Sequence, residues 1–267
     1  MSGVGGQPWQ APRPRLTMAP QLLLLLLALS GPLGASARWP LRADGPVTLG
    51  GRAAALPVVS VANYGAVADG VADSTHAFEL ALAALAKAGG GVLHVPEAAA
   101  QKGNESVYTT LPLQITTSHV TLRLDANTRL LARCDIPRWP LGDPWSNFGE
   151  APQYVPYLWV VNATDFALEG SGAVDGNGTC FWPTAQGHNI TLKHTRPRLI
   201  VIQGVARVSV TGITVTNSPY WTLVFYESTD IHVSGLVVHN PSGGKGRCTT
   251  TTEGCFGPNA DGMRTAI

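Results

Sequence analysis

The sequence predicts an all-β fold, a right-handed parallel β-helix with one α-helix capping its N-terminal end. Two observations support this prediction. Charged residues make up 13% of the 267 residues, while Gly and Pro contribute 30 and 20 residues. A long chain with few charges and frequent Val, Ile and Thr is typical of many short strands joined by turns. The second observation is an internal repeat, because strands that recur at a fixed period indicate stacked coils.

The repeat aligns Val208–Asn217 with Ile231–Asn240 without gaps, an offset of 231 − 208 = 23 residues. Apolar residues match apolar residues, and the glycine and the final asparagine of one segment fall on those of the other. A β-sandwich also uses short alternating strands, but it gives no reason for such a pattern to repeat in register. We therefore expect Asn217 and Asn240 to stack at a turn, with each amide hydrogen-bonded to its equivalent in the next coil.

The same register extends towards the N-terminus. Three segments share one order of strand, turn and strand: 158–170, 200–212 and 223–235. The first two of these segments are offset by 42 residues, which is one period of 23 plus a 19-residue insertion around residues 179–196. Val120 lies 46 residues, or two periods, before Phe166.

One helix is expected, at residues 73–88, after a short strand at 58–61. Asp73 or Ser74 can cap its first turn, and the glycines at 89–91 end it. Apolar residues recur between these limits at i, i+4 and i+7: Phe78, Leu82 and Leu85. We expect this helix to cover the open first coil, so that the coil's edge does not pair with another chain.

The N-terminus resembles a secretory signal peptide. Arg13 and Arg15 precede the apolar run Leu22–Leu29, and Ala35–Ala37 forms an A-x-A cleavage signal. The run is too short to cross a bilayer, which argues against the alternative of a membrane anchor. Translation could also begin at Met18 without changing this interpretation. The chain thus divides into a signal peptide at 1–37, a flexible leader at 38–57 and the folded domain at 58–267.

Four cysteines suit two disulfides in a secreted protein. They are Cys134, Cys180, Cys248 and Cys255. Cys248 and Cys255 close a short loop and are the more plausible pair, although three connectivities remain open. None of the spacings is C-x₂-C, so the sequence does not indicate a zinc site.

Four Asn-x-Ser/Thr sequons make at least one glycan expected in a secreted chain. Their asparagines are Asn104, Asn162, Asn177 and Asn189. The formal net charge of +1 gives no overall field, so nucleic acid is not an expected partner.

Several segments resemble known families. NYGAVADGVADSTHAF at 63–78 is similar to the N-terminal segment of many pectin-lyase-fold proteins. Four further segments resemble, in order and spacing, glycoside hydrolase family 28, the polygalacturonases and related pectin hydrolases. They are LEGSGAVDGNGTCFWP at 168–183, RPRLIVIQ at 196–203, NSPYWTLVF at 217–225 and PNADGM at 258–263. The resemblance covers about residues 58–267.

The resemblance implies inverting hydrolysis of α-1,4-galacturonan or related pectic polysaccharide by clustered aspartates, without a metal or other cofactor. The family's Asn-Thr-Asp-Gly motif corresponds to residues 259–262. Asp261 therefore takes the role of the base that activates water, and Asn259 that of a supporting neighbour. Ala260 departs from the usual threonine and removes a hydroxyl that could hold the turn.

The family's paired aspartates, its Gly-His-Gly motif and its Arg-Ile-Lys motif have no counterpart before Ile267. Residues 263–267 match the start of the strand at 223–228. We therefore expect a C-terminally truncated chain that is inactive alone, and a full-length protein that is a monomer in the cell wall.

Other residues have competing interpretations. Tyr220 is a candidate sugar contact, whereas Trp221 shares the alternation of the following strand and is expected in the core. Lys245 and Arg264 flank Asp261 and could attract uronate carboxylates. Asp175, beside a glycine, is expected in a turn. Two alternative functions stay open, a polysaccharide lyase on the same fold and a catalytically inactive wall-associated β-helix protein.

Overall fold

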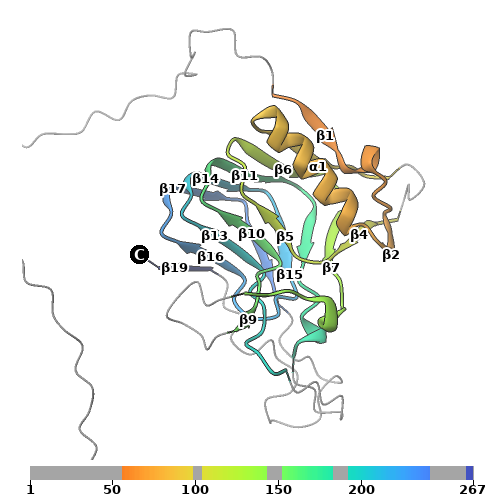
Figure 1. The fold of residues 1–267 in the computed structure, drawn as a ribbon, viewed down its shortest axis with the longest axis vertical. Coiled ribbons are helices and arrows are strands. Elements are labelled where there is room, and N and C mark those ends of the chain that lie inside the picture. Colours follow the sequence, from red (N-terminus) through yellow and green to blue (C-terminus); the bar gives the residue numbers. More distant parts are fainter. Residues whose placement is uncertain (1–55, 99–103, 143–151, 183–191, 241–262, 267) are drawn as a thin grey trace, which may run out of the picture. The chain divides into compact units, whose positions relative to one another are not determined.

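The computed structural model describes residues 56–98, 104–142, 152–182 and 192–240, and the backbone of 263–266. Within these ranges the strands form three parallel sheets and one short antiparallel pair (Figure 1). The antiparallel pair is β8 (Leu141–Gly142) with β9 (Gln153–Tyr154). The predicted signal peptide lies outside the described residues, as does the predicted leader up to residue 55.

Each parallel sheet takes one strand from each successive coil. Sheet A contains, in spatial order, β1 (Val58–Ser60), β3 (Gly91–Val95), β6 (Val120–Leu124), β11 (Thr164–Gly170), β14 (Ala206–Thr211) and β17 (Thr229–Ser234). Sheet B contains β2 (Asp69–Asp73), β4 (Ser106–Thr110), β7 (Thr128–Ala132), β12 (Ala173–Asp175), β15 (Thr214–Thr216) and β18 (Val237–His239). Sheet C contains β5 (Leu113–Ile115), β10 (Leu158–Val161), β13 (Ile200–Gln203), β16 (Leu223–Tyr226) and β19 (Met263–Ala266).

The chain visits sheets A, B and C in turn, which is the predicted parallel β-helix. The 23-residue period is confirmed in all three sheets, since Val208 pairs with Ile231, Thr214 with Val237 and Ile200 with Leu223. The step of 42 residues is also confirmed, as Leu158 pairs with Ile200. The interpretation of the 46-residue step as two periods is wrong, because Thr121 pairs directly with Ala167 and the 46 residues form one longer coil.

Stacked apolar side chains fill the space between the sheets. In sheet A, one row in register contains Leu93, Leu122, Leu168 and Val210, and each of these side chains is fully buried. Matching positions of parallel strands share a face, so the repeat places one such residue in every coil. The core is therefore continuous from one coil to the next.

The helix α1 (Thr75–Ala88) begins two residues later than predicted and ends as predicted at Gly89, whose φ is +78°. Asp73 accepts the amide of Thr75 at 3.0 Å, while Ser74 is the capping residue by backbone position. The helix follows β2 and precedes β3, so it takes the place that a sheet C strand has in later coils. It packs against β1, β3 and β5 and buries Phe78 and Leu85, as predicted (Figure 1).

The predicted ladder of asparagine amides is wrong. Asn217, with φ at +49°, donates its amide to both carboxylate oxygens of Asp175, each at 3.0 Å. Asn240 instead accepts the backbone amide of Ser218 at 2.9 Å. The carboxylate explains the difference, because an ionised acceptor forms a stronger hydrogen bond than an amide oxygen does.

Asp175 is the last residue of β12, and its carboxylate accepts the backbone amide of Asn177 at 2.9 Å in the turn that follows the strand. It is also 3% exposed and forms an ion pair with Arg129 at 2.6 Å. No pattern in the sequence indicates this ion pair. The two residues are 46 positions apart in the chain but lie on β7 and β12, which are paired strands of successive coils.

A disulfide joins Cys134, after β7, to Cys180 in the short 3₁₀ helix η4 (Gly178–Cys180). Two further 3₁₀ helices are η1 (Val61–Tyr64) and η3 (Ile136–Arg138). The disulfide links consecutive coils. It belongs to one of the three connectivities that the sequence leaves open. Cys248 and Cys255 lie outside the described residues.

The described sequons differ in their surroundings. Asn104 and Asn162 are exposed, whereas the side-chain amide of Asn177 donates to the carbonyl of Ala132 at 3.0 Å. Asn189 lies outside the described residues. In the part of the chain that the structure describes, no helix is long and apolar enough to cross a membrane.

Candidate active site

The segments that resemble family motifs come together in sheet C. RPRLIVIQ contains β13, NSPYWTLVF leads into β16, and PNADGM leads into β19. These three strands are neighbours, with Ile200 paired to Leu223 and Leu223 to Met263. The candidate site is therefore the outer face of sheet C, together with the segments that enter its strands.

Two arginines and two aromatic rings stack where the chain enters β13 and β16. The rings of Tyr220 and Trp221 are 5.1 Å apart and nearly parallel, at 12°. The guanidinium carbon of Arg196 is 4.8 Å from the centre of the Tyr220 ring. That of Arg198 is 4.6 Å from the centre of the Trp221 ring. We call these four residues the arginine–aromatic stack.

The backbone holds this stack in the register of the sheet. The amide of Leu199 donates to the carbonyl of Trp221 at 2.9 Å, and that of Ile200 to Thr222 at 3.0 Å. The backbone pairing thus extends one residue before β13 and two residues before β16. Because the strands pair in this register, position 198 lies one coil from position 221.

The stack carries buried positive charge. Arg198 is fully buried and donates to the side-chain carbonyl of Gln153 at 2.6 Å. Arg196 donates to the carbonyl of Pro219 at 2.8 Å, and burial lowers its pKa. Both guanidiniums remain charged at neutral pH, and contact with aromatic faces offsets part of the cost of removing them from water.

Trp221 was predicted to lie in the core. It is buried, at 7% exposed, but it lies outside the main core cluster. It packs with Val201 and Val224 on the outer face of sheet C. The chain bends at Thr222, so the alternation that points Leu223 into the core does not continue to residue 221. Tyr220 is partly buried in the stack, and its role as a sugar contact remains a prediction.

A row of side chains on the outer face of sheet C leads away from the stack. Strand pairing aligns Gln114, Trp159, Val201 and Val224, followed by position 264 in β19. The Trp159 indole N–H donates to the side-chain oxygen of Gln203 at 3.2 Å, which orients its ring. Gln114 and Trp159 are not among the site residues predicted from the sequence. The repeat could have found Trp159, since it falls on Val201 in the aligned segments.

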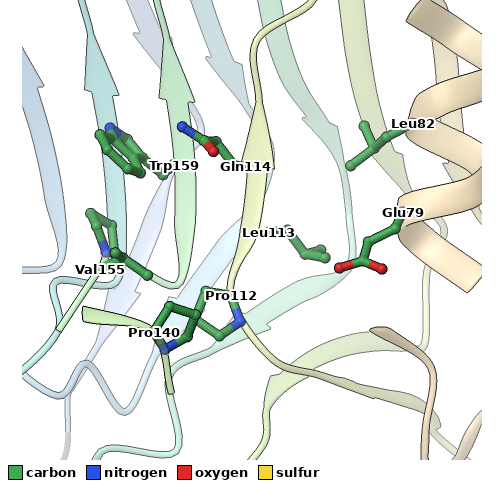
Figure 2. Close-up of a pocket in the computed structure, with 9 residues that line it drawn as sticks. Glu79, Leu82, Pro112, Leu113, Gln114, Pro140, Val155 and Trp159 are labelled. Atoms are coloured by element: carbon green, nitrogen blue, oxygen red, sulfur yellow. The ribbon is translucent and has the colours of Figure 1, made fainter. Parts of the chain in front are cut away.

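A cavity of about 350 Å³ lies at the α1 end of this face (Figure 2). The described residues that line it are Glu79 and Leu82 of α1, Pro112, Leu113 and Gln114 at β5, Pro140, Val155, Pro156, and Trp159 of β10. Figure 2 shows the Trp159 ring and the Glu79 carboxylate on opposite sides, with Gln114 between them. The cavity and the arginine–aromatic stack thus border the same sheet face.

Asn259, Asp261 and Lys245 lie outside the described residues, as does the side chain of Arg264. Among the described residues, no group of three or more His, Cys, Asp or Glu side chains could hold a metal ion.

Comparison with known proteins supports the resemblance. Residues 144–266 match the model of glycosyl hydrolases family 28. A probable polygalacturonase of Vitis vinifera is 32% identical over 191 residues, covering 68% of this chain and 37% of the relative. A polygalacturonase of Chamaecyparis obtusa is 31% identical over 191 residues, covering 70% of this chain and 34% of the relative. The chain thus spans about a third of the length of these curated relatives.

Solved structures show the same fold. The hyperthermoactive exopolygalacturonase from Thermotoga maritima superposes with a TM-score of 0.60 at 22% identity, over 70% of this chain and 48% of that chain. The polygalacturonase from Erwinia carotovora ssp. carotovora superposes with a TM-score of 0.56 at 18% identity, over 79% and 52%. The solved structures show the shared fold, while the family match over residues 144–266 and the plant relatives show that the chain is a polygalacturonase-like protein of glycosyl hydrolases family 28.

Proposed function

We propose that the whole protein is a secreted glycosidase that hydrolyses α-1,4-galacturonan in pectic polysaccharide with inversion. One observation carries the proposal: the family-like segments enter three adjacent strands of one sheet, β13, β16 and β19. Residues far apart in the chain thereby border a single face. A polysaccharide substrate can lie along such a face.

Asp261 is the proposed base. It precedes Met263 by two residues, as Trp221 precedes Leu223, and Met263 pairs with Leu223. On this register Asp261 is expected one coil beyond Trp221, at the entrance to β19. Its carboxylate would take a proton from the water that attacks the anomeric carbon, while Asn259 supports the turn.

Inversion also needs an acid on the other side of the glycosidic bond. That acid protonates the departing oxygen as the bond to the anomeric carbon breaks, and the gap between the two carboxyl groups holds the attacking water. We expect the acid in coils that follow Ile267, and we therefore expect the 267-residue chain alone to be inactive.

The charge of the arginine–aromatic stack supports an acidic substrate. Arg196 and Arg198 put two guanidiniums beside the sheet C face, and galacturonan carries a carboxylate on each unit. A local positive potential raises the concentration of such a polyanion at the site even in a chain of low net charge. We further propose Tyr220, Lys245 and Arg264 as substrate contacts.

Secretion is part of the proposal. The signal-like residues 1–37 support it, as does the disulfide between Cys134 and Cys180. Asn104 and Asn162 are the proposed glycan sites among the described sequons because they are exposed.

The test is to incubate polygalacturonate with a longer form of the protein that continues through the coils expected after Ile267. Hydrolysis releases reducing ends without unsaturated products, and the first product detected by proton NMR has the inverted anomeric configuration. A lyase would give unsaturated ends. No product of either kind would favour an inactive wall protein.

A further inference from the structure

The cavity between α1 and the outer face of sheet C combines features of a saccharide site. Trp159 offers an aromatic face, Gln114 an amide with donors and acceptors, and Glu79 a carboxylate (Figure 2). Its volume, about 350 Å³, lies within the range of about 300–1,000 Å³ typical of small-molecule pockets. A cavity of this size and lining suits a pyranose ring.

The aromatic wall of the cavity is held in place. Trp159 is oriented by the bond to Gln203 at 3.2 Å and lies beside Gln114 in strand register. A fixed indole can pack against the apolar face of a sugar ring, while the amide of Gln114 hydrogen-bonds to hydroxyl groups. Prolines at 112, 140 and 156 complete a rigid wall.

The charge in this cavity differs from that of the arginine–aromatic stack. Among the described residues that line the cavity, Glu79 carries the only formal charge, and it is negative. Its side chain is 62% exposed, and its carboxylate lies 3.6 Å from the ring of His76, which does not line the cavity. A uronate carboxylate entering this cavity would therefore be repelled, whereas an uncharged sugar would not.

The cavity lies within reach of a chain bound at the stack. From β16 to β5 there are three strand spacings along sheet C, about 14 Å at about 4.8 Å each. Trp159 and Val201 connect the two places along one row. A polysaccharide that lies across the coils at the stack can therefore extend into the cavity.

We infer that this cavity is a distal subsite for a neutral pyranose unit. The inference rests on the proposed function, because it takes the ligand to be part of a pectic polysaccharide. Two sources supply a neutral unit, a methyl-esterified galacturonate of the main chain and an uncharged sugar of a side branch. In either case the cavity would select against the fully de-esterified polymer.

The test measures binding to the 267-residue chain by isothermal titration calorimetry at low salt. Three probes separate the sources: trigalacturonate, its fully methyl-esterified form, and galactotriose. In an Arg196→Ala background, which weakens the binding of carboxylates at the arginine–aromatic stack, we expect the methyl-esterified form, galactotriose or both to bind about fivefold more tightly than trigalacturonate, as expected for one carboxylate pair in water. Added salt reduces this difference because it screens exposed charges.

Variants test whether the difference in affinity between charged and neutral probes arises in the cavity. Glu79→Gln should raise the affinity for trigalacturonate about fivefold and leave that for the neutral probes unchanged. The matched control Glu97→Gln removes the same charge between β3 and β4, outside the lining, and should change nothing. Trp159→Ala should weaken the binding of neutral probes about tenfold, while Trp159→Phe retains most of it. Circular dichroism checks that each variant is folded.

Equal binding of charged and neutral probes by the Arg196→Ala chain would overturn the inference. Unchanged binding of the neutral probes by folded Trp159→Ala would also overturn it. Hydrolysis by the longer form is a separate measurement. If that form cleaves polygalacturonate but the cavity binds no neutral probe, only the subsite fails. If the cavity binds but no cleavage occurs, the proposed function fails instead.

Discussion

The guanidinium of Arg198 lies 4.6 Å from the centre of the Trp221 ring, one coil away in the same register. Arg198 is fully buried and bonded to Gln153, so the charge beneath the indole is fixed in place. The same register assigns the next position in this column to Asp261, whose placement is a proposal. The arginine–aromatic stack would then support the coil that carries the proposed base.

Replacing Trp221 by alanine should destabilise the fold. The indole contacts Tyr220 and Arg198 and is 7% exposed, so its removal leaves a cavity beside a buried charge. We expect a loss of about 3–5 kcal/mol in the free energy of unfolding, measured by urea denaturation. Trp221→Phe keeps a ring over the guanidinium and should lose less than half as much. Equal losses in the two variants would show that stacking on Arg198 contributes little.

Two glycines at equivalent positions should respond differently to alanine. Gly212 has φ at +73°, and a Cβ there would lie 2.5 Å from the carbonyl oxygen of Gly170 in the preceding coil. Gly235 has φ at +60°, but its nearest neighbour, Gly212 Cα, would be 3.5 Å away. Gly235→Ala should therefore cost only the strain of the left-handed conformation, about 1–2 kcal/mol. Gly212→Ala must also displace backbone and should cost about 3 kcal/mol or more.

Thermal or urea unfolding of both variants checks this difference. Similar stabilities would mean that the coils can separate at this turn at little cost, contrary to the close spacing of Gly170 and Gly212.

Asp165 should make stability depend on acid pH. The hydrogen bond from Arg207 holds the pKa of this carboxyl below its ordinary value. A carboxyl whose pKa is lower in the folded state stabilises the fold above its unfolded pKa of about 3.9. That contribution is lost as the pH falls through the folded pKa. Asp165→Asn should therefore be less stable than wild type at pH 7, and the difference should shrink as the pH falls below about 4.

Urea unfolding across this pH range measures the difference. In an Arg207→Ala background the same substitution should have a much smaller effect, because the main cause of the pKa shift is absent. A stability difference that stays constant from pH 7 to pH 3 would rule out ionisation of Asp165 as its origin.

The repeat predicted most of the fold because stacked coils repeat their spacing. Pairs such as Val208 and Ile231 were in correct register. The offset of 46 residues between Thr121 and Ala167 was interpreted as two periods, but these residues pair directly, because one coil is lengthened. The helix was predicted because its stop at Gly89 and its apolar spacing are local signals. The insertion after Asp175 did not hide the register, since strands resume at Ile200.

The incorrect predictions concern residues at which a local feature changes the pattern of the repeat. A bend at Thr222 turned Trp221 to the outer face, although the alternation of the following strand placed it in the core. The side-chain amide of Asn217 donates to the carboxylate of Asp175 and not to Asn240, its equivalent in the next coil. Arg198 was not identified as a site residue because its contact with Trp221 depends on pairing that continues before the strands begin.

The central claim, that this is a polysaccharide hydrolase whose base is Asp261, is tested most directly by one substitution. Reducing-end release from polygalacturonate is measured for the longer form and for its Asp261→Asn variant. Asp230→Asn, on sheet A, is the matched control and should keep wild-type activity. We predict that Asp261→Asn lowers kcat by about 10²–10⁴-fold, the usual contribution of acid–base catalysis, and that the 267-residue chain releases nothing. Full activity in the Asp261→Asn variant, or robust turnover by the 267-residue chain, would contradict the account.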